Sequence, residues 1–543
     1  MLIKANYVDI KNKKIFPASV LVESGKIISV KKINKHFSTY ILPGFIDAHI
    51  HIESSMLVPS EFSRIAVKHG TVATVSDPHE IANVLGERGI KFMLDNANNI
   101  DFNFNFGVSP CVPATIFETN GALLDALSVK KLLKNPKLNH LCEVMAFPSV
   151  INDEDEIMQK ILAAKELNIP IDGHAPFLRG KDLKKYIDAG ISTDHEASSY
   201  DEGKEKLDLG MKILIREGSA AKNYEALSSL IKSYSDNLMF CSDDKHPNDL
   251  LKSHINSLVI RSIKKGYDLF DVLKIACINP IEHYNLDVGQ LKVGDKADFI
   301  EVEDLESFNI VRTFINGKIV CIGKETMIKS IYIKPINNFY AEKMKVSDFI
   351  FNAYCDEIEV IQVIDHELYT KEKKYHAHKN KIFSSDVSND ILKISVLNRY
   401  KITKPALSFV NGFRLKCGAI ASSVAHDSHN IIAVGCSDDE ICKAINILIK
   451  SKGGICAVNG SEVLHLDLNI GGIMSSDDAF VVAKKYDELD NFVKNVLGST
   501  LSAPFMTLSF MALLVIPEIK LSDKGLFDAR EFHFIPTCIN EVK

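Results

Sequence analysis

The chain has 543 residues, of which 46% are hydrophobic, so it is long enough to bury the cores of two or three domains. Its 64 basic and 70 acidic residues are spread along the sequence and leave a formal net charge of -6, which excludes a strong electrostatic footprint for nucleic acid or a membrane surface. Small molecules are therefore the expected partners.

The first forty residues contain short strands separated by turns, with Gly25 in a Ser-Gly turn. The opening stretch lacks the apolar segment of a signal peptide, and no run approaches about 18 apolar residues, so we predict a cytoplasmic protein. The same strand pattern returns only after residue 288, around Gly294 and the turn at Asn316 and Gly317. We expect the two flanks, residues 1–40 and 289–345, to form one small β-sandwich domain.

Between the flanks, apolar strands alternate with helical stretches, which is typical of a parallel α/β fold. Helices are expected at 61–70, 154–168 and 181–190, the last two ending near Asn168 and Gly190. Strands are expected at 41–51, 70–79, 102–110, 141–149, 169–176, 190–197, 211–219 and 237–244. Eight such strands predict a closed (β/α)8 barrel over residues 41–288.

From residue 346 to 543 the pattern is that of a separate α+β domain, with strands around 407–435 and a helix near 438–451. This domain contains a second His-x-His motif, His376 and His378, in a lysine-rich stretch with no preceding strand. We interpret that motif as solvated surface rather than a metal site.

Eleven cysteines, an odd number, are scattered along the chain without a Cys-x-x-Cys pair. This distribution argues against a disulfide framework and against a thiolate zinc site. We expect most of these cysteines to be reduced thiols in or near the cores.

The predicted barrel strands end on polar or ionisable residues, and barrel enzymes build their sites at that end of the strands. His49 and His51 are two residues apart in a strand, so their rings face the same side. Imidazoles and carboxylates suit zinc, iron or manganese, and four histidines with two carboxylates are enough for two ions. The predicted ligands are His49, His51, Glu143, His174, His195 and Asp243.

The motifs PGFIDAHIH, HIHIESSM, SDPHEIANV, DGHAP and DHE together resemble those of the bacterial adenine deaminases, a family of the amidohydrolase superfamily. The stretch GAIASSVAHDSHNIIAVG resembles that family's additional C-terminal domain, so the likeness spans nearly the whole chain. It implies a metal-dependent barrel, a composite β domain, and hydrolysis of adenine to hypoxanthine and ammonia in purine salvage. It also implies two divalent ions, Mn2+ or Fe2+ before Zn2+, and a homo-oligomer, expected to be a dimer.

The fourth predicted strand departs from the wider superfamily. Many binuclear members bridge their metals with a carbamylated lysine on this strand, but LCEVMAFPS contains no lysine and only one carboxylate, Glu143. By resemblance to the adenine deaminases, Glu143 is the bridge. The alternative is that Glu143 is a strand-end carboxylate paired with some other cation.

The expected mechanism follows from charge. Two divalent ions that share a water lower its pKa from 15.7 towards roughly 7, and the resulting hydroxide would attack C6 of the purine. Asp243 is the expected base. Protons for ring N1 and for the leaving ammonia would come from Asp77, His79 and Glu80, which are also expected to bind substrate. Glu80 could instead cap the following helix, whose first turn favours acids.

Other residues at the strand ends have more than one interpretation. Ser54 and Ser55 could hydrogen-bond either substrate or backbone. Arg216 and Glu217 are expected to pair with each other rather than to contact substrate, and Ser109 fits equally well as a turn residue.

Two further pairs are open. Asp244 and His246 could orient Asp243 or only shape their loop. His426 and His429 look like a second metal site, but they lie in an apparent loop without a third convergent ligand. The family resemblance implies that this loop reaches the active site or a subunit interface.

Two rival functions remain for this sequence. A cyclic-amide hydrolase, such as a dihydropyrimidinase or hydantoinase, would use the same scaffold, but such enzymes usually carry the fourth-strand lysine. A non-catalytic assembly protein on a decayed barrel would have lost ligands, and none is missing here.

Overall fold

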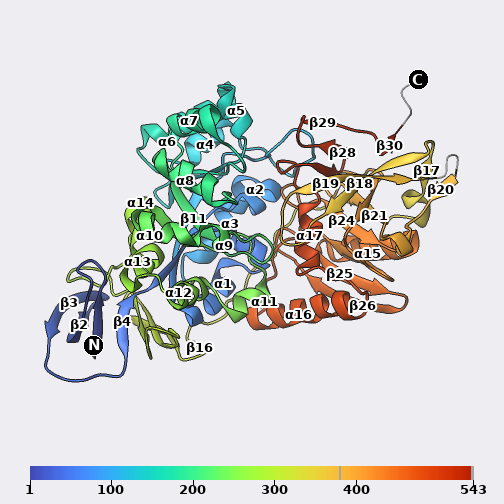
Figure 1. The fold of residues 1–543 in the computed structure, drawn as a ribbon. Coiled ribbons are helices and arrows are strands. Elements are labelled where there is room, and N and C mark those ends of the chain that lie inside the picture. Colours follow the sequence, from blue (N-terminus) through green and yellow to red (C-terminus); the bar gives the residue numbers. More distant parts are fainter. Residues whose placement is uncertain (378–380, 540–543) are drawn as a thin grey trace.

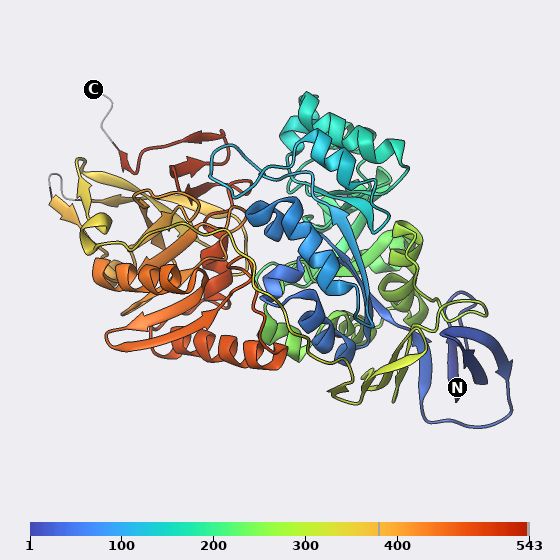
Figure 2. The ribbon, with the colours of Figure 1, turned by 180° about the vertical axis from the view of Figure 1, so that it is seen from behind.

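The computed structural model describes residues 1–377 and 381–539 and has three parts in chain order. A β-sheet formed by both flanks lies at one end, a barrel occupies the middle, and an α+β domain lies at the other end (Figure 1). The same order is visible from behind in Figure 2. The predicted fold class is confirmed, whereas the residue boundaries given for the three domains remain predictions.

Eight parallel strands form the barrel in chain order. Five of them pair in one sheet and three in a second sheet. The circle closes where Ile50 bridges Asp243 in parallel, and Ser192 donates to Ile171 O (2.9 Å) between the two sheets. The strands are β5 Phe45–Ile50, β6 Thr71–Ser76, β7 Asn103–Val108, β8 Leu138–Val144, β9 Ile171–Gly173, β10 Thr193–Asp194, β11 Lys212–Arg216 and β12 Leu238–Cys241. All eight predicted barrel strands are therefore present.

Helices surround the barrel, and the three that we predicted correspond to α1, α6 and α7. The barrel helices are α1 Pro59–Ala66, α2 His79–Leu85, α3 Glu87–Ala97, α4 Ala126–Leu132, α5 Phe147–Ile151, α6 Asp155–Glu166, α7 Gly180–Asp188, α8 Tyr200–Asp208, α9 Tyr224–Leu227, α10 Ile231–Tyr234, α11 Pro247–Lys252, α12 Ile255–Lys264, α13 Leu269–Leu273 and α14 Asn279–Tyr284. Within the described ranges, no helix has the length and apolarity needed to cross a bilayer.

The two flanks together form one eight-stranded sheet. Its strands, in spatial order, are β16 Glu325–Thr326, β15 Lys318–Ile322, β14 Ile310–Ile315, β13 Phe299–Val302, β4 Tyr40–Pro43, β1 Leu2–Asp9, β2 Lys14–Glu23 and β3 Lys26–Lys32. The single strand predicted over 41–51 is wrong in one respect, because Gly44 divides it into β4 and β5. A Cβ atom at Gly44 would lie 2.3 Å from Val72, so only glycine fits this close crossing between the sheet and the barrel.

The C-terminal domain contains a nine-stranded sheet with α15 Asp438–Ser451 packed on it. Buried Ile441, Ile445 and Leu448 share one face of α15, and Ser437 caps its first turn. The sheet strands are β18 Glu357–Val363, β19 Thr370–His376, β21 Leu392–Leu397, β22 Ala406–Asn411, β23 Ala419–Ser422, β24 Ile431–Gly435, β25 Gly454–Asn459, β26 Glu462–Asp467 and β30 Cys538–Ile539. The smaller elements are β17 Phe351–Ala353, β20 Lys381–Phe383, β27 Ile519–Ser522, β28 Gly525–Asp528, β29 His533–Phe534, α16 Ala479–Asn495 and α17 Pro504–Phe510.

The prediction for the second His-x-His motif, that no strand precedes it, is wrong. The stretch that leads into it is a strand, β19, which pairs with β18 in antiparallel orientation. His376 is exposed, and His378 lies outside the described residues.

The C-terminal domain covers the rim of the barrel. Ser475 donates its backbone N–H to Met56 O (2.8 Å), and Arg64 of α1 pairs with Asp478 (2.6 Å). On another side, the segment that follows β7 reaches the domain, where Thr119 N donates to Asp523 (2.9 Å) (Figure 2). The loops at the carboxyl ends of the barrel strands are therefore shielded from solvent by a second domain.

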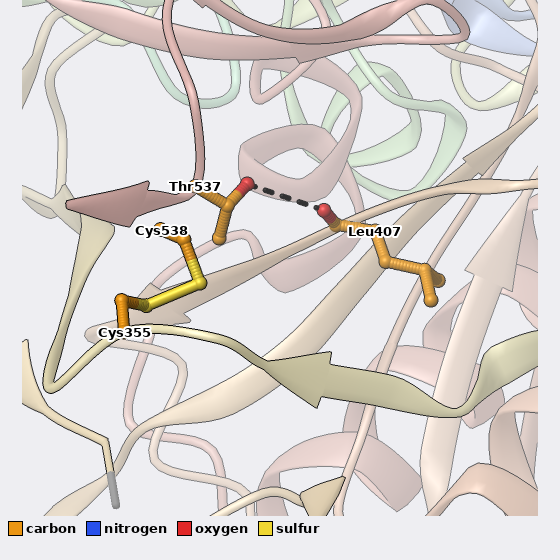
Figure 3. The surroundings of a disulfide bond; sticks show 4 residues. All are labelled: Cys355, Leu407, Thr537 and Cys538. Atoms are coloured by element: carbon orange, nitrogen blue, oxygen red, sulfur yellow. Dashed lines mark hydrogen bonds between the residues drawn. A yellow bond between two sulfur atoms is a disulfide. The ribbon is translucent and has the colours of Figure 1, made fainter. Parts of the chain in front are cut away.

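The eleven cysteines fall into two groups. Nine are free, in agreement with the expectation of reduced thiols, and one pair, Cys355 and Cys538, forms a disulfide that the spacing did not predict (Figure 3). The two cysteines are 183 residues apart and meet because β30 pairs with β18. Thr537 next to the bond donates to Leu407 O (3.4 Å).

A buried ion network fixes two loops of the barrel. Lys206 of α8 is fully buried and donates to Asp194 (2.9 Å), Glu202 (2.8 Å) and the carbonyl of Ala175 (2.7 Å). Asp194 in turn accepts from the backbone N–H groups of Ala175 and Ala197, each at 2.9 Å. This network therefore sets the ends of β9 and β10.

We predict that Lys206→Met lowers the free energy of unfolding by about 3–5 kcal/mol, because two carboxylates stay buried without their cation. Lys204→Met on the same helix is the control, since its pair with Asp208 is exposed and contributes little. Urea denaturation followed by circular dichroism measures both variants. Equal losses in the two variants would contradict the network.

Candidate metal centre at the barrel rim

The six residues predicted as metal ligands meet where β5, β8, β9, β10 and β12 end. None of them is more than 6% exposed. Two sets of three have all their donor atoms within 4.8 Å of one another. The first set is His49, His195 and Asp243, and the second is Glu143, His174 and His195. His51 joins both sets, because its Nε2 atom lies 3.2 Å from Glu143 Oε1 and 3.2 Å from Asp243 Oδ1.

The strand geometry of β5 presents the two histidines as predicted. The Nε2 atoms of His49 and His51 are 3.2 Å apart. His51 Nδ1 lies 3.1 Å from the carbonyl oxygen of Asp77, which can only accept, so Nδ1 carries the proton. The lone pair of His51 Nε2 is therefore directed into the cluster, as a metal ligand requires.

Glu143 lies between the two sides of the cluster. Its Oε1 atom faces His51, while Oε2 lies 2.7 Å from His174 Nδ1 and 3.4 Å from His195 Nε2. Burial would raise the pKa of Glu143, but the imidazoles of His174, His195 and His51 outweigh burial and hold it well below its usual value. An ionised carboxylate with one oxygen on each side has the form that a bridge between two cations needs.

The donor set fits two divalent cations. It contains four imidazoles and two carboxylates, which suit first-row metals. His174 Nε2 is buried and has no hydrogen-bond partner among the described residues, so its electron pair is available.

Asp243 has a strained backbone at the end of β12, with φ of 54°. Its N–H donates to His49 O (2.9 Å), which ties β12 to β5. Its side chain is divided between two neighbours, since Oδ1 faces His51 and Oδ2 lies 2.6 Å from Arg216 Nη1. Burial would raise the pKa of Asp243, but the Arg216 guanidinium and the histidines hold it well below its usual value.

The predicted pair of Arg216 and Glu217 is wrong. Arg216 donates a hydrogen bond to Asp243 and two to Glu196, whose carboxylate accepts from both terminal nitrogens of the guanidinium. Glu217 pairs instead with Arg261 (2.8 Å) and Lys222 (3.4 Å). Neighbouring residues at a strand end point to opposite faces, so only Arg216 turns into the barrel.

Glu196 was overlooked in the sequence, although it stands in the motif DHE directly after His195. Its Oε1 atom lies 3.3 Å from His195 Nε2, so it connects that ligand to Arg216. Glu196 and Arg216 also line a small cavity of about 50 Å³ that residues 366–369 of the C-terminal domain close. Position next to a ligand histidine was the only signal available for Glu196.

The three predicted acids, Asp77, His79 and Glu80, lie beside the cluster at the start of α2. Asp77 Oδ2 lies 3.1 Å from His79 Nδ1, and its Oδ1 accepts from Ser109. His79 Nδ1 is 3.5 Å from Glu143 Oε1, and its Nε2 is 3.2 Å from Glu80 Oε1. The structure therefore brings the predicted acids and the predicted ligands together in one site.

Glu80 turns away from its own helix and towards the C-terminal domain. Its Oε1 atom contacts His426 Nδ1 and its Oε2 atom contacts His429 Nε2. The loop of these two histidines thus reaches the active site, as the family resemblance implied. Burial would raise the pKa of Glu80, but the imidazoles of His426, His79 and His429 outweigh burial and hold it well below its usual value.

The remaining candidates have ordinary partners. Ser54 donates to Asp244 (2.5 Å), and Ser55 donates to the backbone carbonyl of Ile52 (2.6 Å). His246 does not contact Asp243, because its Nδ1 atom pairs with the hydroxyl of Tyr486 on α16. Asp244 extends the polar network around the site, as do Glu196 and Ser109, which also lie just past barrel strands.

Comparison with known proteins agrees with this geometry. The amidohydrolase family matches residues 40–320, and the adenine deaminase C-terminal domain matches residues 367–533. The adenine deaminase of a Sulfurovum species is 60% identical over 99% of this chain and 100% of the relative. That of Borreliella burgdorferi is 50% identical over 98% of this chain and 99% of the relative.

A solved dihydropyrimidinase from Brevibacillus agri aligns with a TM-score of 0.46 and 12% identity, over 60% of this chain and 96% of its own. A likeness of that size does not by itself indicate a fold or a function. The amidohydrolase family is metal-dependent, and the buried rim cluster has donor atoms that could bind metal. The full-length identity to adenine deaminases and the two matching domains together show that this chain belongs to the adenine deaminase family of amidohydrolases.

Proposed function

We propose that this protein hydrolyses adenine to hypoxanthine and ammonia, as a step of purine salvage. The observation that carries the proposal is the position of Glu143, an ionised carboxylate with one oxygen on each side of a buried histidine cluster. The choice of adenine as the substrate follows from the similarity to full-length relatives named adenine deaminase. A homo-oligomer, expected to be a dimer, and a cytoplasmic location remain predictions from the sequence.

The metal ions are the first part of the proposal. They would be held by His49, His51, Glu143, His174, His195 and Asp243. Mn2+ or Fe2+ is favoured over Zn2+ by resemblance to the family, although these ligands suit several first-row metals. When bound, such ions supply the positive charge that brings the pKa of water near neutrality and so makes it a nucleophile.

The protein's own groups would handle the protons. We propose Asp243 Oδ1 as the base, because Oδ1 faces the histidine pair while Arg216 holds Oδ2 and fixes the carboxylate plane. Of the predicted acids, His79 would donate to the purine ring and to the leaving nitrogen, since ammonia is a poor leaving group unless protonated. Asp77 and Glu80, whose pKa values are held below their usual range, would act as the carboxylates that hold His79. Both the role of base and that of proton donor are inferred from the positions of these side chains at the rim of the barrel.

The rival cyclic-amide hydrolase is disfavoured by two features of the site. The cluster contains Glu143 where such enzymes usually carry a modified lysine. In addition, His79, held between the carboxylates of Asp77 and Glu80, suits a ring whose nitrogens must gain protons during attack. Attack on an amide carbonyl requires fewer proton donors beside the ring.

Metal removal is the first test. We expect purified protein to contain close to two equivalents of divalent metal, and chelation to abolish adenine turnover, because the cluster is built for cations. Metal analysis by mass spectrometry and an ammonia assay measure the two quantities, and re-addition of Mn2+ or Fe2+ should restore activity. Full turnover by demonstrably metal-free protein would end the metal proposal.

The bridge and the base should respond differently to substitution. Glu143→Ala should lose metal and activity together, since the two cations lose the charge between them. Asp243→Asn should retain much of the metal but lower kcat by about 10²- to 10⁴-fold, because an amide cannot accept the proton. Glu217→Ala is the control, since Glu217 sits at the same rim and points away from the site. If Glu143→Ala kept both metals and a normal rate, Glu143 would be only structural.

The substrate test separates the two enzyme classes. Metal-loaded protein is offered adenine, adenosine, guanine, cytosine, dihydroorotate and hydantoin, with ammonia measured for the amines and ring opening for the amides. We expect adenine to release ammonia with an ultraviolet shift to hypoxanthine, and adenosine to be poor, as the family resemblance implies. Efficient opening of a cyclic amide with adenine untouched would favour the rival class.

A further inference from the structure

The loop between β23 and β24 places His426 of the C-terminal domain at the rim of the barrel. His426 is 4% exposed, and its Nδ1 atom contacts Glu80 Oε1 while its Nε2 atom lies 4.0 Å from Asp244 Oδ1. Glu80 follows β6 and Asp244 follows β12, and these two strands flank β5 in the closed barrel. His426 therefore spans the end of the strand that carries His49 and His51.

His429 holds the other oxygen of Glu80, and its protonation is set by the backbone. The N–H of Ala425 donates to His429 Nδ1 (3.2 Å), so Nδ1 must be an acceptor. The proton of His429 then lies on Nε2 and is donated to Glu80 Oε2. His429 is thus a neutral donor, and His426 is the imidazole whose charge can match Glu80.

The charge on His426 agrees with its surroundings. Burial lowers its pKa, but the carboxylates of Glu80 and Asp244 outweigh burial and raise the pKa to about 9. His426 therefore lies between two carboxylates, which favour its protonated form. Without His426, Glu80 would keep His79 and His429 as its imidazole partners but would lose the contact at Oε1 that comes from the C-terminal domain.

The contacts form one continuous chain around the mouth of the site. Asp77 contacts His79, His79 contacts Glu80, and Glu80 contacts His426, which lies near Asp244. His426 is the link that the barrel itself does not supply. Each oxygen of Glu80 faces an imidazole of the loop between β23 and β24, so this loop holds the carboxylate at both oxygens.

We propose that His426 is a positioning residue for adenine hydrolysis, which holds Glu80 as an oriented carboxylate beside His79 at the rim of the site. The inference rests on the proposed function and extends it, since it makes the C-terminal domain part of the active site. His426 acts through Glu80 and need not touch the purine. Its packing against Phe510 (5.1 Å between ring centroids) is the structural role from which the test must separate it.

The test compares two substitutions at one position. His426→Phe keeps an aromatic ring beside Phe510 but donates nothing, whereas His426→Asn keeps a donor near the place of Nδ1. We expect His426→Phe to lower kcat for adenine about 100-fold with little change in KM, because a misplaced group costs about that much in the transition state. His426→Asn should recover most of this loss. His533→Phe changes an exposed histidine of the same domain and should retain the wild-type rate.

Metal content and melting temperature are measured on every variant, and both should match the wild-type protein. A double variant completes the design. If His426 acts through Glu80, the combination of His426→Phe with Glu80→Gln should be no slower than Glu80→Gln alone. Multiplied losses in the double variant would overturn the proposal, as would a normal rate for His426→Phe or a rate that falls only with metal content or stability.

Failure of the proposed function is recognised separately. If the wild-type protein released no ammonia from adenine under metal-loaded conditions, the function itself would be overturned, whatever the variants did. If the wild-type protein is active and His426→Phe is equally active, only the role of His426 is overturned. Loss of an additional metal equivalent in His426→Phe would overturn it in favour of a ligand role.

Discussion

The closure of the barrel between β5 and β12 is the constraint on which the site depends. Ile50 and Asp243 form the parallel bridge that completes the circle, and Asp243 N donates to His49 O (2.9 Å). The same peptide groups that close the sheet therefore place the carboxylate of Asp243 beside the imidazoles of His49 and His51. Asp47 of β5 accepts hydrogen bonds from His254 (2.7 Å) and from Ser242 N (3.0 Å). Because Ser242 directly follows β12, the second bond also holds these two strands together.

Burial of so many ionisable groups is tolerated only because each has a partner of suitable charge. Arg216 lies between Asp243 and Glu196, and Glu143 lies among three histidines. Arginine cannot give up its proton, so Arg216 keeps its two carboxylates ionised over a wide range of pH. The site is thus already ionised and oriented by the protein, which reduces the reorganisation needed during a reaction.

The C-terminal domain has two effects on this site. It covers the rim, which lowers the local dielectric constant and strengthens each charge interaction within. It also supplies His426 and His429, whose contacts with Glu80 no barrel residue replaces within the described ranges. Adenine hydrolysis would then depend on the packing between two domains as well as on the barrel. This agrees with relatives whose identity extends over the full chain.

The sequence by itself determined the eight strands and the six clustered residues, because strand alternation and strand-end position are local properties of the chain. It misassigned the partner of Arg216, since a side chain at a strand end chooses its neighbour only after the barrel closes. It could not reveal the disulfide, 183 residues apart, or the contact of Glu80 with His429, 349 residues apart. Such pairs are set by how one domain packs on another, and no local periodicity records that packing.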